Sequence, residues 1–367
     1  MPELADIFRR HGPEYLSKFS DRMLPSHLTA MEDILNCRTE AMGGHVHVCD
    51  HCAALRYSYH SCKNRHCPKC GGDSADLWLK KQLDLLLPQF YFLVTFTLPE
   101  ELRSVARANQ KAVYDLLFTS SSEALKKLAL DPRILGGRLA MLGVLHTWGR
   151  DLCYHPHIHY IVAGGCLSSD NRWLGSSEKF LVPVAALSPI FRGKFRDGLK
   201  KLGLSADPRV WEKSWVVHSK PVGAGESALR YLAPYVYRVA LSNNRIEHVG
   251  ENTVSFRYKQ SDTGSWRRMI LSSMDFIQRF LQHVLPDGFH KVRYYGLLSP
   301  RNRNTFKLLQ NILTTSSTLE AILKSREEQL STLSAGNRAA EPPLCPHCGG
   351  TLRWLKSLSP TGRGPPW

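Results

Sequence analysis

The chain has 367 residues, 43% of them hydrophobic, which is enough for a main domain with a buried core and one or two small modules. Its 48 Lys and Arg against 32 Asp and Glu give a formal net charge of +16, which favours a nucleic-acid partner, with an acidic membrane surface as the weaker alternative. No apolar run approaches the roughly 20 residues that cross a bilayer, and the N-terminus carries no secretory pattern, so we expect a cytoplasmic bacterial protein.

Apolar periodicity predicts helices over residues 1–36, and residues 37–72 then form a segment dense in Cys, His and Gly. Strands and helices alternate between about residues 88 and 300, which predicts an α+β or α/β core. The expected strands in this core are 91–98, 139–146, 157–163, 215–219, 253–258 and 269–271. Residues 301–367 hold one more helical stretch, a Cys-x-x-Cys pair and a Gly- and Pro-rich end that we expect to be disordered.

The segment 37–72 is predicted to be a zinc-binding module. Two Cys-x-x-Cys turns at this spacing can close a four-thiolate site, here with the ligands Cys49, Cys52, Cys67 and Cys70. The alternative is a chance cluster of buried thiols. The segment could also hold a second zinc ion, with the ligands Cys37, His45, Cys62 and His66. The alternative is that these histidines contact nucleic acid or pack inside the protein. Because the module is too short for its own core, zinc would supply its folding energy.

A further Cys-x-x-Cys pair, Cys345 and Cys348, is half a site. No second pair follows it. It could borrow ligands from elsewhere in the chain, pair between protomers, or stay empty.

A His-x-His pattern lies in the predicted strand 157–163. Residues two apart in a strand face the same side, so His157 and His159 project together and could hold a divalent metal. His155 would share this face, but Pro156 is expected to mark the beginning of the strand. The alternative is a pair of half-exposed histidines on an edge strand.

Two tyrosines four residues apart, Tyr231 and Tyr235, would lie on one face of a helix predicted over 225–240, with Pro234 bending it between them. The alternative is an amphipathic helix that buries two rings. A phenol is a poor nucleophile unless a base or a metal activates the reaction, so the tyrosines matter only if the histidines lie near them.

These motifs occur in a recognisable order along the chain. The Cys-rich module precedes Phe92-Leu93-Val94-Thr95-Phe96-Thr97-Leu98-Pro99, then His157-Ile158-His159, then Tyr231-x3-Tyr235. This combination resembles the paired-tyrosine rolling-circle transposases of bacterial insertion sequences, members of the HUH (His-hydrophobic-His) endonuclease superfamily.

The resemblance implies an α+β fold with a central antiparallel sheet, flanking helices and the zinc module at the N-terminal side. It implies cleavage of single-stranded DNA with Mg or Mn on His157 and His159, and with His155 or His146 as the third ligand. One of Tyr231 and Tyr235 would attack the phosphate to form a 5′-phosphotyrosine, and the other would serve strand transfer.

Basic residues are expected to contact the DNA backbone, which gives affinity without sequence choice. Aromatic side chains among them could stack on unpaired bases. For any one basic residue the alternative is a solvated surface. The candidate contacts are Lys63, Arg65, Lys194, Arg196, Lys200, Lys201, Arg238 and Arg245.

Two other functions fit the same motifs. A plasmid-type replication initiator would use the same chemistry, and a non-catalytic zinc-dependent DNA-binding regulator would use the histidines and tyrosines only as structure. The zinc module ahead of the nuclease motifs favours the transposase.

Overall fold

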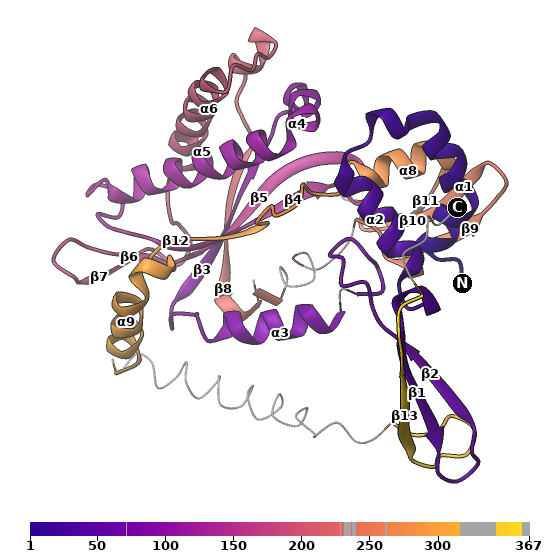
Figure 1. Ribbon diagram of the computed structural model, residues 1–367. Coiled ribbons are helices and arrows are strands. Elements are labelled where there is room, and N and C mark those ends of the chain that lie inside the picture. The colour runs from indigo at the N-terminus through magenta and orange to yellow at the C-terminus, as the bar shows by residue number, and fades with distance from the viewer. Residues whose placement is uncertain are drawn as a thin grey trace.

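The computed structural model describes residues 1–70, 72–227, 229–230, 236, 240–260, 263–315 and 343–361 (Figure 1). It mixes helices with antiparallel sheets, so the predicted α+β class is confirmed. Three parts are visible: a central sheet covered by helices, a helical part that contains both α1 (Leu4–Phe19) and α8 (Ser273–Leu281), and a narrow arm built from β1 (Gly44–Cys49), β2 (Leu55–Tyr59) and β13 (Leu352–Leu358). Within the described residues, no helix is long and apolar enough to span a bilayer.

The central sheet has five strands in the order β12-β4-β5-β3-β8, and all neighbours are antiparallel. The three inner strands follow the predicted apolar runs closely. The edge strand β12 was not predicted, because Arg293 and Gly296 leave no continuous apolar run in its five residues. The strands are β3 (Phe90–Thr97), β4 (Ala140–Trp148), β5 (Tyr154–Ala163), β8 (Val217–Ala224) and β12 (Val292–Gly296), and a small hairpin of β6 (Gly165–Leu167) and β7 (Trp173–Gly175) follows β5.

Helices cover both faces of this sheet (Figure 1). On one face, α5 (Gln110–Leu130) and α6 (Val184–Lys201) close a core of fully buried rings such as Phe96 and Tyr160. The other face is lined by aliphatic side chains and meets α3 (Gly72–Leu83) and α9 (Arg303–Thr315). Because side chains alternate along β5, each one lies either in the layer beneath α5 and α6 or in the layer beneath α3 and α9.

Gly143 of β4 leaves room for the ring of Tyr160, its partner on β5. A Cβ at this position would lie 2.6 Å from Cε1 of that buried ring. We expect Gly143→Ala to lower the free energy of unfolding by about 1–3 kcal/mol, because the core is already full. Calorimetry would measure this, with the exposed helical Gly193→Ala, whose Cβ meets nothing within 4 Å, as the control. Equal melting of the two variants would contradict the expectation.

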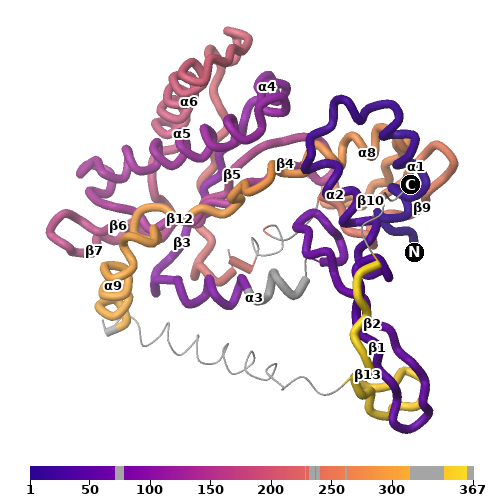
Figure 2. The backbone as a smooth tube through the Cα atoms, in the orientation of Figure 1, coloured from indigo at the N-terminus to yellow at the C-terminus, as the bar shows by residue number. Residues whose placement is uncertain are grey.

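The N-terminal helices α1 (Leu4–Phe19) and α2 (Pro25–Asn36) do not fold apart from the rest of the chain. They share a core with α8 (Ser273–Leu281) and with a second antiparallel sheet. In this core, the ring of Phe8 on α1 meets the ring of Phe280 on α8 edge to face, with centroids 5.6 Å apart. Figure 2 shows α1, α2 and α8 lying together. This sheet consists of β9 (Ile246–Val249), β10 (Thr253–Lys259) and β11 (Trp266–Ser272), in the order β11-β10-β9.

The arm is a three-stranded sheet in the order β13-β1-β2. The hairpin of β1 (Gly44–Cys49) and β2 (Leu55–Tyr59) comes from the Cys-rich segment, and β13 (Leu352–Leu358) comes from the tail. No strand was predicted for these seven residues, because β13 depends on β1, a hydrogen-bonding partner from the other end of the chain. The short elements are α4 (Arg103–Ala108) and the 3₁₀ turns Ser20–Arg22, Glu40–Met42, Glu100–Leu102, Pro208–Trp211, Asn243–Arg245 and Pro300–Asn302.

Candidate metal centre and cysteine clusters

Three histidines converge on one face of the central sheet. His157 and His159 lie two residues apart on β5, and His146 lies opposite His157 on β4. The ring centroid of His146 is 5.2 Å from that of His157 and 4.7 Å from that of His159, and the two β5 rings are 4.8 Å apart. One nitrogen of each ring lies within 4.8 Å of the others. This group, the histidine triad, offers three nitrogen ligands to one ion.

The face of the sheet on which the triad lies follows from the alternation of side chains along β5. Ile158 and Tyr160 are fully buried in the layer beneath α5 and α6, so the histidines between them face the opposite layer. Contrary to expectation, the strand begins at Tyr154 and contains Pro156. The register slips between β4 and β5 just before the triad, and this irregularity accommodates a proline inside an inner strand.

Sequence analysis gave two candidates, His155 and His146, for the third ligand of the catalytic metal. The structure groups His146 with the pair, and the imidazole is 2% exposed. His155 lies outside the group, with its Nδ1 3.0 Å from a guanidinium nitrogen of Arg103.

Hydrogen bonds hold the two β5 rings in place. The Nδ1 of His157 donates to the carbonyl oxygen of His155 at 2.7 Å, and the Nδ1 of His159 lies 2.8 Å from Oγ1 of Thr95 on β3. An engaged Nδ1 is the usual support behind a histidine that binds metal through Nε2. Sequence reasoning assigned Thr95 no role of its own, although the Thr-x-Thr alternation of β3 could have placed it on the triad face.

Burial keeps the triad neutral. Desolvation lowers the pKa of His157 to about 3 and that of His159 to about 4, and it holds the pKa of His146 well below its usual value. Neighbouring imidazoles and lysines lower these values further. Neutral imidazole is the form that binds a metal ion, so the triad can bind one at neutral pH without first releasing protons.

Tyr231, Tyr235 and Arg238 lie outside the described residues. Two described neighbours of the tyrosines, Leu229 and Val236, pack into the apolar layer on the triad face of the sheet, where Val144 and Ile161 also lie.

A short path of contacts connects Val236 with the triad. The carbonyl oxygen of Val236 is 3.5 Å from Nζ of Lys291, which lies 4.6 Å from the ring of Trp148. That ring stacks on His146 with a centroid distance of 5.8 Å. Desolvation lowers the pKa of Lys291 to about 7.

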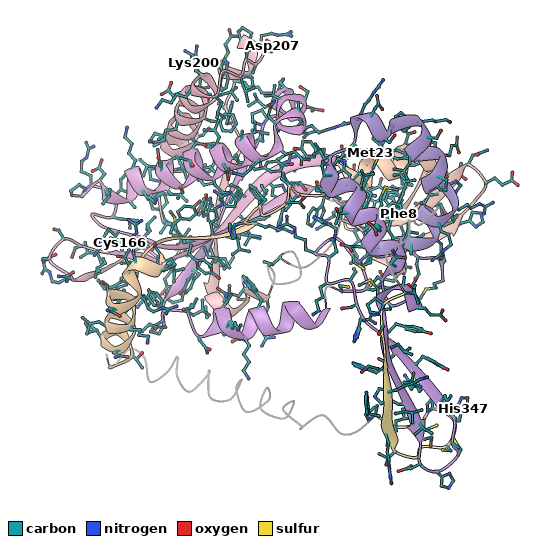
Figure 3. The ribbon with its side chains drawn as sticks, viewed as in Figure 1. Phe8, Met23, Cys166, Lys200, Asp207 and His347 are labelled. Atoms are coloured by element: carbon teal, nitrogen blue, oxygen red, sulfur yellow. The ribbon has the colours of Figure 1, made fainter. Side chains whose placement is uncertain are left out.

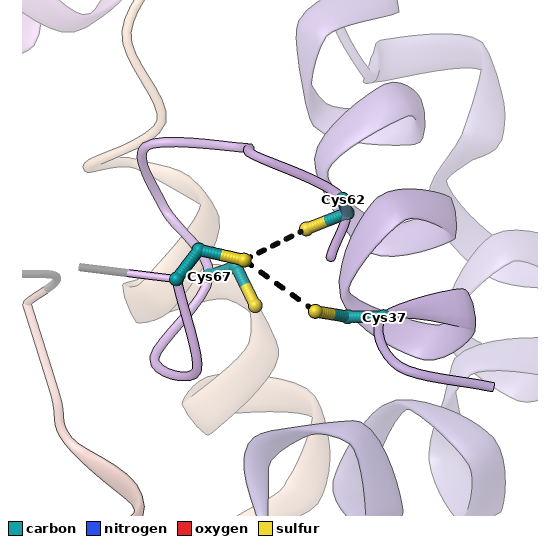
Figure 4. A group of neighbouring side chains, drawn as sticks. Cys37, Cys62 and Cys67 are labelled. Carbon is teal, nitrogen blue, oxygen red and sulfur yellow. Dashed lines mark hydrogen bonds between the residues drawn. The ribbon is translucent and has the colours of Figure 1, made fainter. Parts of the chain in front are cut away.

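The first cysteine cluster is formed by Cys37, Cys62, Cys67 and Cys70. Their Sγ atoms lie within 4.8 Å of one another, and Cys70 is 3.5 Å from Cys37 and 3.6 Å from Cys62. Figure 4 shows Cys37, Cys62 and Cys67 turned toward one another between the end of α2 and the following loop. Hydrogen bonds from Cys62 and Cys67 lower the pKa of the Cys37 thiol, and the bonds with Cys37 in turn raise the pKa of the Cys62 and Cys67 thiols.

The second cluster joins Cys49 and Cys52 to Cys345 and Cys348. The predicted site of Cys49, Cys52, Cys67 and Cys70 is therefore wrong, because the two Cys-x-x-Cys turns belong to different clusters. The first turn lies beyond β1 in the arm, whereas Cys67 is buried in the core of the N-terminal helices. The Cys-x-x-Cys pair of the tail therefore lies beside a second pair from elsewhere in the chain.

The predicted second site of Cys37, His45, Cys62 and His66 is wrong in its histidines. His45 lies on β1 against the ring of His60, with centroids 4.8 Å apart. The Nε2 of His66 accepts a hydrogen bond from the backbone N–H of Leu285 at 3.2 Å. Cys67 and Cys70 take the places of these two histidines.

Several predicted DNA contacts have structural partners. Arg65 donates to the carbonyl oxygens of Pro286 and Phe289 at 2.9 and 2.7 Å, and so fixes the loop after α8 to the Cys-rich segment. Arg245 donates to the carbonyl oxygens of Arg150 and Arg257. Lys63 is exposed.

The basic group on α6 lies on the face of the sheet away from the triad. Lys194 pairs with Glu123 of α5, whereas Arg196, Lys200 and Lys201 are exposed. Figure 3 shows Lys200 at the outer edge of the α5 and α6 layer. These residues could reach only DNA that extends well beyond the metal centre.

Comparison with known proteins agrees with this architecture. Residues 7–98 match the family model of a transposase zinc-binding domain, and residues 140–305 match a model described as "Putative transposase". The chain is 41% identical over 325 residues to "Putative transposase y4qJ" of Sinorhizobium fredii (strain NBRC 101917 / NGR234), covering 82% of this chain and 81% of that protein. It is 28% identical over 291 residues to the transposase for insertion sequence element IS801 of Pseudomonas savastanoi pv. phaseolicola, covering 73% and 69%. No solved structure matches.

The chain is thus a DNA-processing enzyme with an N-terminal zinc-binding domain. It belongs to the transposase family represented by these relatives, which confirms the resemblance stated from its motifs. Its partner is DNA, and its reactions are the cleavage and transfer of DNA strands. The first cysteine cluster lies within the matched zinc-binding domain and has the four thiolates of a structural zinc site.

Proposed function

We propose that this transposase cleaves single-stranded DNA by attack of Tyr231 or Tyr235 on a phosphate held at the histidine triad. The observation that carries the proposal is the convergence of His146, His157 and His159 on the face of the sheet against which Leu229 and Val236 pack. Leu229 and Val236 flank Tyr231 and Tyr235 in the sequence, so their packing on the face that carries the triad supports the proposal.

The triad fits a divalent ion, which would polarise the scissile phosphate as a Lewis acid. Three imidazoles are softer donors than the carboxylates that Mg²⁺ prefers, so the donor set favours Mn²⁺ over Mg²⁺. His157 and His159, held by the carbonyl of His155 and by Thr95, would fix the position of the phosphate without rearrangement.

The proposed reaction needs no energy source such as ATP, because each phosphorus–oxygen bond that breaks is replaced by another. The phenol oxygen of one tyrosine loses its proton to solvent and forms a bond to phosphorus, while the bond from phosphorus to the 3′ oxygen breaks and the departing 3′ oxygen takes a proton from solvent. The product is a 5′-phosphotyrosine with a 3′-hydroxyl end. The second tyrosine can accept another strand in the same way, which allows one chain to begin and end a transfer.

A surface suited to unpaired DNA lies on the β9–β11 sheet. A hollow there is lined by Trp266 together with Glu247, Arg257, Arg267 and Arg268. Trp266 is 54% exposed, and cations from Arg257 and Lys259 lie 5.1 and 5.5 Å from its ring. An exposed indole among cations can stack on a base while the cations hold the backbone. This supports a single-stranded substrate.

Denaturing electrophoresis tests the proposal directly. The purified chain is incubated with Mn²⁺ and labelled single-stranded oligonucleotides from both ends of its element. We expect a labelled band at the mass of protein plus DNA that survives denaturant and disappears when EDTA is added first. Tight binding without any such band, at every divalent ion tried, would instead support the non-catalytic regulator.

A further inference from the structure

We propose that Cys49, Cys52, Cys345 and Cys348 bind a second zinc ion, and that this ion fastens the C-terminal tail to the N-terminal hairpin. The matched zinc-binding domain ends at residue 98, so two of these four ligands lie far outside it. The proposal concerns the arm alone and does not depend on the chemistry of strand cleavage.

The sulfur positions fit tetrahedral zinc. The Sγ atoms of Cys49 and Cys348 are 3.4 Å apart, those of Cys52 and Cys345 are 3.7 Å apart, and all four lie within 4.8 Å of one another. A Zn–S distance of about 2.3 Å in a tetrahedron requires sulfurs about 3.8 Å apart. A disulfide needs sulfurs about 2.05 Å apart, and none is formed in this cluster.

The two Cys-x-x-Cys turns have the same backbone geometry. Ala53 follows the first pair with φ +55° and donates its N–H to the carbonyl oxygen of Cys49 at 3.1 Å. Gly349 follows the second pair with φ +73° and donates to Cys345 at 2.8 Å. A positive φ at an alanine costs free energy, and such strain persists where surrounding bonds enforce it. Two equivalent turns facing each other are what a shared ion would enforce.

The turns are held together closely by their strands. The Cα register pairs Cys49 with Leu352, and the N–H of Asp50 donates to the carbonyl oxygen of Thr351 at 3.1 Å. A Cβ on Gly350 would lie 3.0 Å from Sγ of Cys49 and 2.8 Å from Cβ of His51. The glycine therefore allows the tail to approach the sulfur cluster.

The arm has almost no apolar core of its own. Its buried cluster contains Cys49, Cys345 and Leu352, with Ala54 against it. Val46 of β1 is buried, but Tyr57 on β2 and Trp354 on β13 are 51% and 62% exposed. Figure 3 shows this arm extending from the body, with His347 near its outer end. So little burial cannot hold three strands together, and a metal ion is the usual substitute.

Metal counting on the full chain tests the proposal. Elemental analysis after dialysis, and native mass spectrometry of the unaltered protein, should both give two zinc ions per chain. The variant with Cys345→Ser and Cys348→Ser should retain one, and so should Cys62→Ser, which removes a ligand of the first cluster. The matched control is Cys153→Ser, because Cys153 is exposed and lies outside both clusters.

Hydrogen exchange supplies a second measurement on the same proteins. In the Cys345 and Cys348 double variant, amides of β1 should exchange at least tenfold faster than in the unaltered chain, while those of β3 and β5 keep their rates. One zinc per unaltered chain would overturn the proposal, as would a double variant that still holds two. Unchanged exchange in β1 would overturn the fastening role.

Discussion

Replacing His157 with alanine should abolish metal-dependent cleavage of single-stranded DNA while leaving the fold intact. The side chain lies on the face of β5 opposite the core that contains Ile158 and Tyr160, so its loss removes one of three ligands without opening that core. A metal that stabilises developing charge contributes several kcal/mol, and about 4 kcal/mol corresponds to about a thousandfold in rate. The measurement is the rate of nicking of a labelled oligonucleotide at increasing Mn²⁺.

Two further variants separate the triad from its surroundings. His146→Ala should lose as much activity as His157→Ala, because its ring completes the group. His155→Ala should stay within about tenfold of the unaltered chain, since the hydrogen bond to His157 comes from its backbone carbonyl, which alanine keeps. If His155→Ala proves as inactive as His157→Ala while His146→Ala cleaves normally, the assignment of the third ligand is reversed. Full activity of His157→Ala would show that the histidine triad is not the catalytic metal site.

The double substitution of Tyr231 and Tyr235 by phenylalanine should eliminate the covalent protein–DNA product. Phenylalanine keeps the ring and removes only the oxygen that would bond to phosphorus, so DNA binding should persist. Removal of a covalent nucleophile lowers a rate by about 10⁴-fold or more. The amount of denaturant-resistant adduct measures this, and filter binding of the same oligonucleotide measures affinity.

Tyr237→Phe is the matched control, because it removes a phenol from the same segment at a position outside the four-residue spacing. It should form adduct at the normal rate. The single variants Tyr231→Phe and Tyr235→Phe then separate the roles of the two tyrosines. The variant that blocks the first cleavage identifies the attacking tyrosine, and the variant that forms adduct but joins no strand identifies its partner. An adduct that persists in the double variant would show that another residue is the nucleophile.

The histidine pair could be placed from sequence because its geometry is local. Alternation within one strand decides that His157 and His159 face one side, whatever the strand pairs with. The third histidine depends on the register between β4 and β5, which is set by many contacts across the sheet. The sequence therefore offered His146 only as one of two candidates, and the pairing of His146 with His157 had to come from the structure.

The cysteines show the opposite case. A Cys-x-x-Cys turn reveals that two sulfurs act together, but it carries no information about which second turn completes the site. Sequence proximity favoured Cys67 and Cys70 as partners of Cys49 and Cys52, whereas the fold supplies a pair from the tail. For the same reason β13 was missed: it is a strand only because β1 lies beside it.

The arm also has a consequence for how the protein is made. Cys49 leaves the ribosome early, yet one of its sulfur partners is 299 positions further along the chain. Throughout synthesis the hairpin therefore exists with only half of its ligands. A product that stops before Cys345, through a nonsense codon or an interrupted gene copy, can build the first cluster and the strands that carry the histidines but never the finished arm. If the arm is needed for transposition, defective copies of the element would yield only incomplete enzymes.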